Sequence, residues 1–211
     1  MPPRLRPARS YARRAPTRQP YDYVLIVCEG GKTEPQYFDA LILAEGLSSA
    51  NVHVISGDGH TDPVSIVKIA ESKLANGYDR IFCVFDRNGH ANYEEALSRI
   101  ESQEAGQNGT LTAITSWPCF EVWLLLHFAY SSAPFQKTGN RSACDNVVRS
   151  LLGHVPDYAK GRATTYVELV DRLDLAMKHA SRLAKDNVKT GSTNPATSAF
   201  ELVNYLKNLK K

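Results

Sequence analysis

Two uninterrupted apolar runs constrain the fold of this chain most. Residues 23–28 (Tyr-Val-Leu-Ile-Val-Cys) and residues 80–85 (Arg-Ile-Phe-Cys-Val-Phe) are rich in β-branched and aromatic side chains. Such runs are typical of strands that are buried on both faces, which requires helices on both sides of the sheet. Shorter runs at 51–56 and 111–115 have the same character. We therefore predict four strands at the centre of the molecule.

Helical patterns separate these runs. Thr33 is suited to cap the first helix, with Pro35 in its first turn, and Thr61 or Asp62 is suited to cap the second. A third helix should run through Tyr93. Single helices between successive strands imply right-handed crossovers. The predicted fold class is therefore α/β, with a mostly parallel sheet flanked by helices.

The chain divides into three predicted parts. Residues 1–20 hold six arginines, five prolines and no acid, whereas the rest has 19 basic and 22 acidic residues. We expect 1–20 to be a disordered basic arm, which either attracts nucleic-acid phosphate or merely solubilises the chain. Residues 21–116 form the predicted α/β core. Residues 117–211 form a helical C-terminal part packed on the core, with helices expected after Thr165 and Ser198, each from a capping-box pattern.

The distribution of apolar residues and cysteines indicates which compartment the protein belongs to. No run of about 18 apolar residues occurs, because Glu121 and His127 interrupt the densest stretch, so no membrane span is expected. The basic start lacks the apolar core of a secretory signal, which predicts a cytoplasmic protein. The cysteines form no CxxC pair, and we expect all four to be reduced core residues: Cys28, Cys83, Cys119 and Cys144.

Acidic residues follow two of the predicted strands. Glu29 ends the first and Asp86 ends the third, and the carboxyl ends of parallel strands share one edge of a sheet. Glu29 is placed to hold a divalent cation or to move a proton. Asp86, Asn88 and His90 offer an oxygen-rich site for Mg²⁺ or Mn²⁺. The alternative is that Asp86 caps the next helix while Asn88 forms a turn.

The segment Gly30-Gly31-Lys32-Thr33 has the Gly-Lys-Thr ending of a phosphate-binding P-loop. The first glycine of that motif is missing, since position 26 is Ile, and Glu29 would repel phosphate. The same loop suits metal-assisted phosphoryl chemistry instead, with Lys32 offsetting phosphate charge.

Glu121 lies in the first turn of an otherwise apolar helix. An acid in such surroundings needs a metal ion or a cation as its partner, although a favourable contact with the helix dipole would also place it there. His127, further along this helix, is expected to be a core residue. Asp58 falls at the same sheet edge, where we expect a turn.

Three segments of the chain resemble the RloB-like proteins: 26–38 (Ile-Val-Cys-Glu-Gly-Gly-Lys-Thr-Glu-Pro-Gln-Tyr-Phe), 84–88 (Val-Phe-Asp-Arg-Asn) and 117–128 (Trp-Pro-Cys-Phe-Glu-Val-Trp-Leu-Leu-Leu-His-Phe). Residues 156–160 and 193–197 match weaker blocks of that family. The resemblance spans roughly 21–206. It implies a Toprim-like (Rossmann-like) first half, a link to restriction–modification and abortive phage-defence loci, and an ABC-type ATPase as partner.

The resemblance also implies roles for individual residues. Glu29 matches the Toprim glutamate, a general acid/base or metal ligand, and Asp86 matches the first metal-binding aspartate. Asn88 stands where a second aspartate is usual, so the site has one fewer negative charge. The segment around Glu121 is a feature of RloB-like proteins rather than of Toprim domains in general.

From these residues we predict a Mg²⁺- or Mn²⁺-dependent Toprim-like nuclease in phage defence, acting on RNA such as tRNA or on phage DNA. The predicted metal ligands are Glu29, Asp86, Asn88 and Glu121. The predicted catalytic residues are Glu29, Asp86, Glu121 and Lys32. The predicted phosphate-binding residues are Lys32, Arg87, His90 and Lys160.

Two other functions stay open at this point. One is a non-catalytic nucleic-acid- or partner-binding module with a degenerate site, which the missing charge at Asn88 favours. The other, weaker, is a nucleotide-sensing or nucleotide-making role. The substrate, the trigger and homo-oligomer formation are not set by these patterns.

Overall fold

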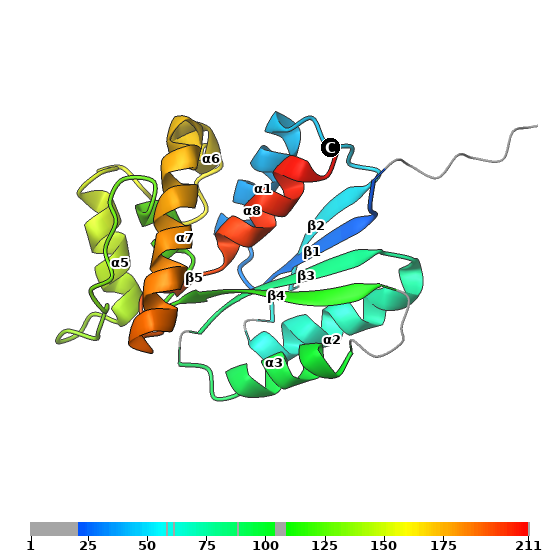
Figure 1. Cartoon of the computed structure of the whole chain (residues 1–211), viewed down its shortest axis with the longest axis horizontal. Helices are drawn as coiled ribbons and strands as arrows, with labels where there is room; N and C mark the ends of the chain where they lie inside the picture. The colour runs from blue at the N-terminus through cyan, green and yellow to red at the C-terminus, as the bar shows by residue number, and fades with distance from the viewer. Residues whose placement is uncertain (1–20, 58, 61, 88, 104–108, 211) are drawn as a thin grey trace, which may run out of the picture.

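The computed structural model describes residues 21–57, 59–60, 62–87, 89–103 and 109–210. The predicted arm at 1–20 lies outside them. At the centre is a five-stranded sheet of order β2-β1-β3-β4-β5 (Figure 1). Its parallel strands are β1 (Val24–Cys28), β2 (Val52–Ser56), β3 (Arg80–Asp86) and β4 (Thr110–Trp117). The sequence did not predict the short β5 (Ala196–Thr197), which is antiparallel to β4.

Helices cover both faces of the sheet, as the apolar runs require (Figure 1). On one face lie α1 (Thr33–Ala44) and α8 (Ala199–Asn208), and on the other lie α2 (Pro63–Lys73) and α3 (Tyr93–Ser102), with a short 3-10 turn (Leu74–Asn76) after α2. All five residues of β1 are buried. The chain is thus a Rossmann-like α/β fold with a mostly parallel sheet, which confirms the predicted class.

The start of α2 shows how local sequence sets an element. The Asp62 side chain accepts a hydrogen bond of 3.1 Å from the Ser65 N–H, and Pro63 occupies the first helical position. The aspartate satisfies one of the free N–H groups of the helix N-terminus, and the proline removes another because it has no N–H. The cap predicted at Thr61 or Asp62 is therefore confirmed at Asp62. The cap predicted at Thr33 is wrong, because Thr33 is the first residue of α1 and Lys32 is its N-cap.

The remaining helices lie together beyond one end of the sheet (Figure 1). They are α4 (Glu121–Leu125), α5 (Ala143–Leu152), α6 (Thr165–Leu169) and α7 (Leu173–Thr190). A 3-10 turn at Val170–Arg172 separates α6 from α7, and Thr164 rather than Thr165 is the N-cap, so the predicted capping box there is wrong. Apolar residues of α4, α5 and α7 belong to the same core as β1 and α1.

The capping box predicted at Ser198 does not form either. The Ser198 hydroxyl instead accepts a hydrogen bond of 2.8 Å from the Thr115 N–H of β4. This bond ties the start of α8 to the edge of the sheet beside β5.

The prediction for the cysteines is half right. Cys28 and Cys83 are unpaired and buried in the sheet, as expected. Cys119 and Cys144 form a disulfide, with Cα atoms 5.6 Å apart, so the prediction of four reduced thiols is wrong. The bond depends on α5 folding back onto the start of α4, which spacing along the chain does not reveal.

Candidate active site

Glu29 and Asp86 meet at the ends of neighbouring strands. Glu29 Oε2 accepts a hydrogen bond of 2.9 Å from the Asp86 backbone N–H. The contact follows from the parallel pairing of β1 with β3, in which Cys28 lies opposite Val84. It joins the Glu29 carboxylate to the backbone of Asp86 rather than to its side chain. A single ion shared by both carboxylates therefore stays a prediction.

Asp86 is surrounded by negative charge. Burial raises the pKa of its carboxyl well above the usual range, and the charges of Glu34, Glu121 and Glu29 raise it further. A hydrogen bond from the Phe120 backbone acts in the opposite direction. An aspartate with these neighbours is destabilised in its charged form, so it favours a proton or a bound cation.

Glu34 is a member of this cluster that sequence reasoning missed. It lies in the first turn of α1, and burial raises the pKa of its carboxyl to about 7, with Glu121 and Glu29 adding to the effect and Lys160 opposing it. Gly30 makes room for it, because a Cβ at that position would lie 2.0 Å from Glu34 Oε2. The sequence offered one indication of this role: Glu34 is an acid in the first turn of a helix that follows a pair of glycines.

Glu121 is almost fully buried, with 2% of its surface exposed. Lys160 Nζ lies 3.2 Å from Glu121 Oε1, and the Tyr158 hydroxyl donates a hydrogen bond of 3.1 Å to the same oxygen. Both partners come from the loop between α5 and α6. The partner that a buried acid requires is therefore a cation of this chain. The role predicted for Lys160, which is phosphate binding, stays a prediction.

His90 pairs with Glu29. Its Nε2 lies 3.1 Å from Glu29 Oε1, so one Glu29 oxygen faces His90 and the other faces the Asp86 backbone. Burial raises the pKa of the Glu29 carboxyl, while the Asp86 hydrogen bond and His90 lower it in part. Glu29 is thus held by two contacts, and its proton affinity responds to His90.

Arg87 points to a different neighbourhood. Its guanidinium lies 4.2 Å from the centre of the Trp117 ring and 5.0 Å from that of Tyr93, and it forms an ion pair of 3.0 Å with Glu94. It lines a cleft of about 460 Å³ beside the ends of β4 and β5, called here the β4 cleft. Residues of the C-terminal end of α7, among them Asn187, line the other wall.

Lys32 is exposed and precedes α1. Its side chain packs close to Gly161, and the Gly161 N–H donates a hydrogen bond of 2.9 Å to the Thr33 hydroxyl. The loop that carries Lys160 is therefore docked on the start of α1. The role predicted for Lys32 with phosphate stays a prediction.

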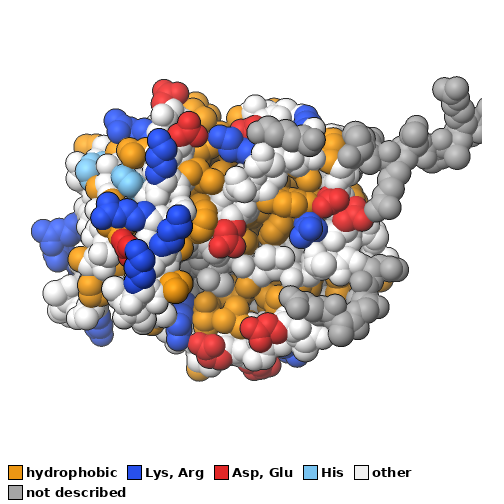
Figure 2. Space-filling view, viewed as in Figure 1, with side chains coloured by type: hydrophobic (Ala, Val, Ile, Leu, Met, Phe, Trp, Pro, Cys, Tyr) orange, Lys and Arg blue, Asp and Glu red, His pale blue; other side chains and the backbone are white. Residues whose placement is uncertain are grey.

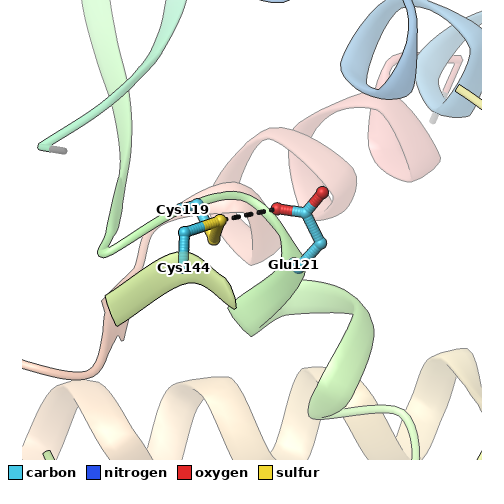
Figure 3. Close-up of side chains that lie close together, drawn as sticks. All are labelled: Cys119, Glu121 and Cys144. Carbon is cyan, nitrogen blue, oxygen red and sulfur yellow. Dashed lines mark hydrogen bonds between the residues drawn. A yellow bond between two sulfur atoms is a disulfide. The ribbon is translucent and has the colours of Figure 1, made fainter. Parts of the chain in front are cut away.

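Cys119, Glu121 and Cys144 have ligand atoms within 4.8 Å of one another, and Figure 3 shows the three side chains together. Cys144 Sγ lies 3.6 Å from Glu121 Oε2 and 3.3 Å from Lys160 Nζ. The two sulfurs are bonded to each other, and a disulfide has no thiolate to offer a metal ion. In this form the cluster is a covalent support for Glu121 rather than a metal site.

The structure tests the prediction for His127 but not those for Asn88 and Asp58. His127 is fully buried, its Nδ1 lies 3.0 Å from the Trp123 carbonyl oxygen, and burial lowers its pKa to about 4, so it is a core residue as expected. Asn88 and Asp58 lie outside the described residues, and their predicted roles are untested.

The fold and these contacts define an α/β protein with partly buried acids at the carboxyl ends of two parallel strands and a buried acid at the start of α4. A family model described as RloB-like protein matches residues 24–206. The chain therefore belongs to the RloB-like family, as its sequence motifs indicated. No curated protein and no solved structure gave a significant match. Within the described residues no helix is long and apolar enough to cross a membrane.

Proposed function

We propose that this protein is a Mg²⁺- or Mn²⁺-dependent, Toprim-like nuclease that cleaves phosphodiester bonds in anti-phage defence, together with an ABC-type ATPase. The observation that carries the proposal is electrostatic. Glu29 directly follows β1, and Glu34, Asp86 and Glu121 belong to α1, β3 and α4. Burial, together with the charges of the other three acids, raises the pKa of Asp86 well above its usual range. The defence setting and the ATPase rest on what the family resemblance implies.

The side chains present fit a divalent cation. Carboxylate oxygens are the ligands that Mg²⁺ and Mn²⁺ prefer, and desolvated acids near one another are stabilised by added positive charge. Asp86, Glu34 and Glu29 would hold the ion, with Asn88 as the predicted fourth ligand. When bound, such an ion polarises a phosphoryl oxygen and lowers the pKa of an attacking water.

The chain's own residues divide the remaining work. Glu29 is placed to move a proton, because its carboxylate is oriented by the Asp86 N–H and its second oxygen contacts His90. Lys160 offsets negative charge at the same cluster through its contact with Glu121. Arg87 would bind a neighbouring phosphate from the β4 cleft, where two aromatic rings hold its guanidinium.

One observation favours a second candidate, a non-catalytic binding module. Glu29 is paired with His90 and Glu121 with Lys160, so two of the four acids already have a basic partner in this chain. A site neutralised in this way keeps its architecture without a metal ion.

Cleavage of labelled RNA and DNA in the presence of Mn²⁺ separates the two candidates. We expect Glu29→Gln and Asp86→Asn each to lower the rate at least about 100-fold, as removal of a general base or a metal ligand does. Asp171→Asn, which alters an exposed acid beyond α6, is the matched control. Unchanged cleavage in both site variants would discard the nuclease proposal.

A further inference from the structure

The charges of this chain are strongly segregated. Residues 21–128 contain 6 basic and 15 acidic side chains, whereas residues 129–190 contain 10 basic and 6 acidic ones. The second stretch includes α5, α6 and α7, which lie together beyond one end of the sheet. Figure 2 shows Lys and Arg side chains gathered over this half of the molecule, while acidic side chains dominate elsewhere on the same face.

Within that half, α7 carries a regular basic stripe. Lys178, Arg182, Lys185 and Lys189 are all exposed, and their spacing of four, three and four residues places them on one face of the helix. The opposite face of α7 is buried in the core through residues such as Ala180 and Leu183. At 1.5 Å per residue, the stripe is about 16 Å long.

The stripe is incompletely neutralised. Asp186 lies beside it, with a carboxylate oxygen 3.5 Å from Arg182 Nε. The pKa of Asp186 is lowered mainly by the hydrogen bond that its carboxylate accepts from the Tyr130 hydroxyl, and further by Arg182 and Lys189. Arg182 also lies 4.1 Å from the centre of the Tyr130 ring. Among the described residues, Lys178 and Lys185 have no acidic partner within ion-pair distance. Two ammonium groups therefore face solvent without a counter-charge.

The stripe lies on the helix that ends at the β4 cleft. Ala184, Val188 and Gly191 form part of the wall of this cleft. Val188 is 86% exposed and lies one helical turn from Lys185. Across the cleft are Trp117 and Arg87, and Arg87 directly follows Asp86 in the chain.

We propose that α7 holds the nucleic-acid strand: its phosphates lie along Lys178, Arg182, Lys185 and Lys189, and the strand continues through the β4 cleft toward Asp86. This inference rests on the proposed nuclease function and names the surface that presents the substrate. Evenly spaced cations bind a phosphate backbone without regard to sequence. Trp117 beside Arg87 gives the cleft an aromatic surface suited to a base.

Binding of a fluorescent single-stranded oligonucleotide, as DNA and as RNA, tests the surface in EDTA, where no cleavage takes place. The double variant Lys178→Gln/Lys185→Gln should bind about tenfold more weakly in low salt, and the slope of log K against log salt should become shallower by about 1.4. Lys68→Gln/Lys73→Gln on α2 removes the same charge at a distant helix and is the matched control. The full chain is used, so residues 1–20 contribute equally to every variant.

Equal affinity and slope for the α7 variant and the control would overturn the proposal, and so would a wild-type protein that binds neither oligonucleotide. Either result would be expected if the stripe binds an acidic protein instead of a nucleic acid. Trp117 supplies a second readout, because a base stacked in the cleft should quench a part of the tryptophan emission that Trp117→Phe abolishes. Binding through α7 without cleavage in Mn²⁺ would support the surface while discarding the nuclease.

Discussion

Lys160 Nζ lies 3.2 Å from Glu121 Oε1, so a cation from the loop between α5 and α6 is paired with a buried acid at the start of α4. Lys160→Met should leave the carboxyl group of Glu121 buried and without this partner. We expect a loss of about 1–3 kcal/mol in the free energy of unfolding, less than for a fully buried pair because the Lys160 side chain is 57% exposed.

Urea unfolding measures this loss, and a second substitution identifies its cause. Adding Glu121→Gln to Lys160→Met removes the unpaired carboxyl group, so the double variant should recover part of the stability. Lys185→Met on the exposed face of α7 is the control. If the loss of unfolding free energy in the double variant equals the sum of the losses in the two single variants, the two side chains act independently.

Reduction of the Cys119–Cys144 disulfide should also destabilise the protein. The bond closes a loop between residues 25 apart, and the entropy that this loop removes from the unfolded chain corresponds to about 3.5 kcal/mol of stability. Thermal unfolding with and without a dithiol reductant measures the effect. Cys119→Ser/Cys144→Ser should remove the response to reductant, whereas Cys28→Ser should keep it. A wild-type Tm that is insensitive to reductant would contradict the prediction.

His127 should make stability fall in mild acid. Its pKa is lowered to about 4 in the folded protein by burial, so the unfolded chain takes up a proton first as the pH falls below about 6.5. Between pH 7 and pH 5 this group alone should cost about 2 kcal/mol. His127→Gln removes that contribution. The stability of wild type minus that of the variant should therefore be lower at pH 5 than at pH 7 by this amount. The same difference at both pH values would refute the prediction.

The sheet could be predicted from sequence because its signals are local. The apolar runs before Glu29 and Asp86 specify strands buried on both faces, and strand–helix alternation then gives a parallel order in which β1 and β3 are neighbours. The two-residue β5 could not be predicted, since it depends on α7 returning the chain to the edge of β4.

The site was predictable only in part, because several of its contacts join residues that are far apart in the chain. Acids at strand ends are visible in sequence, but the partners of Glu121 lie 23 to 39 positions away, and neither the Tyr158 contact nor the disulfide at Cys144 has a sequence pattern of its own. Glu34 was overlooked because an acid in the first turn of a helix is common and has a dipole explanation. Only its burial beside Asp86 distinguishes it.

Glu34 gives the sharpest test of the acidic cluster. Its pKa of about 7 exceeds the usual 4.5, so its contribution favours the folded state in acid and is lost as the pH rises through 7. Glu34→Gln should therefore raise stability above pH 8, by up to about 3 kcal/mol, and change it little at pH 4. Asp39→Asn, which alters an exposed acid on the same helix, is the control.

If the cluster binds a divalent cation, Mn²⁺ at pH 8 should raise the Tm of wild type and of Asp39→Asn by mass action. The Tm of Glu34→Gln should rise clearly less. An equal Mn²⁺ shift in all three proteins would place the ion away from Glu34.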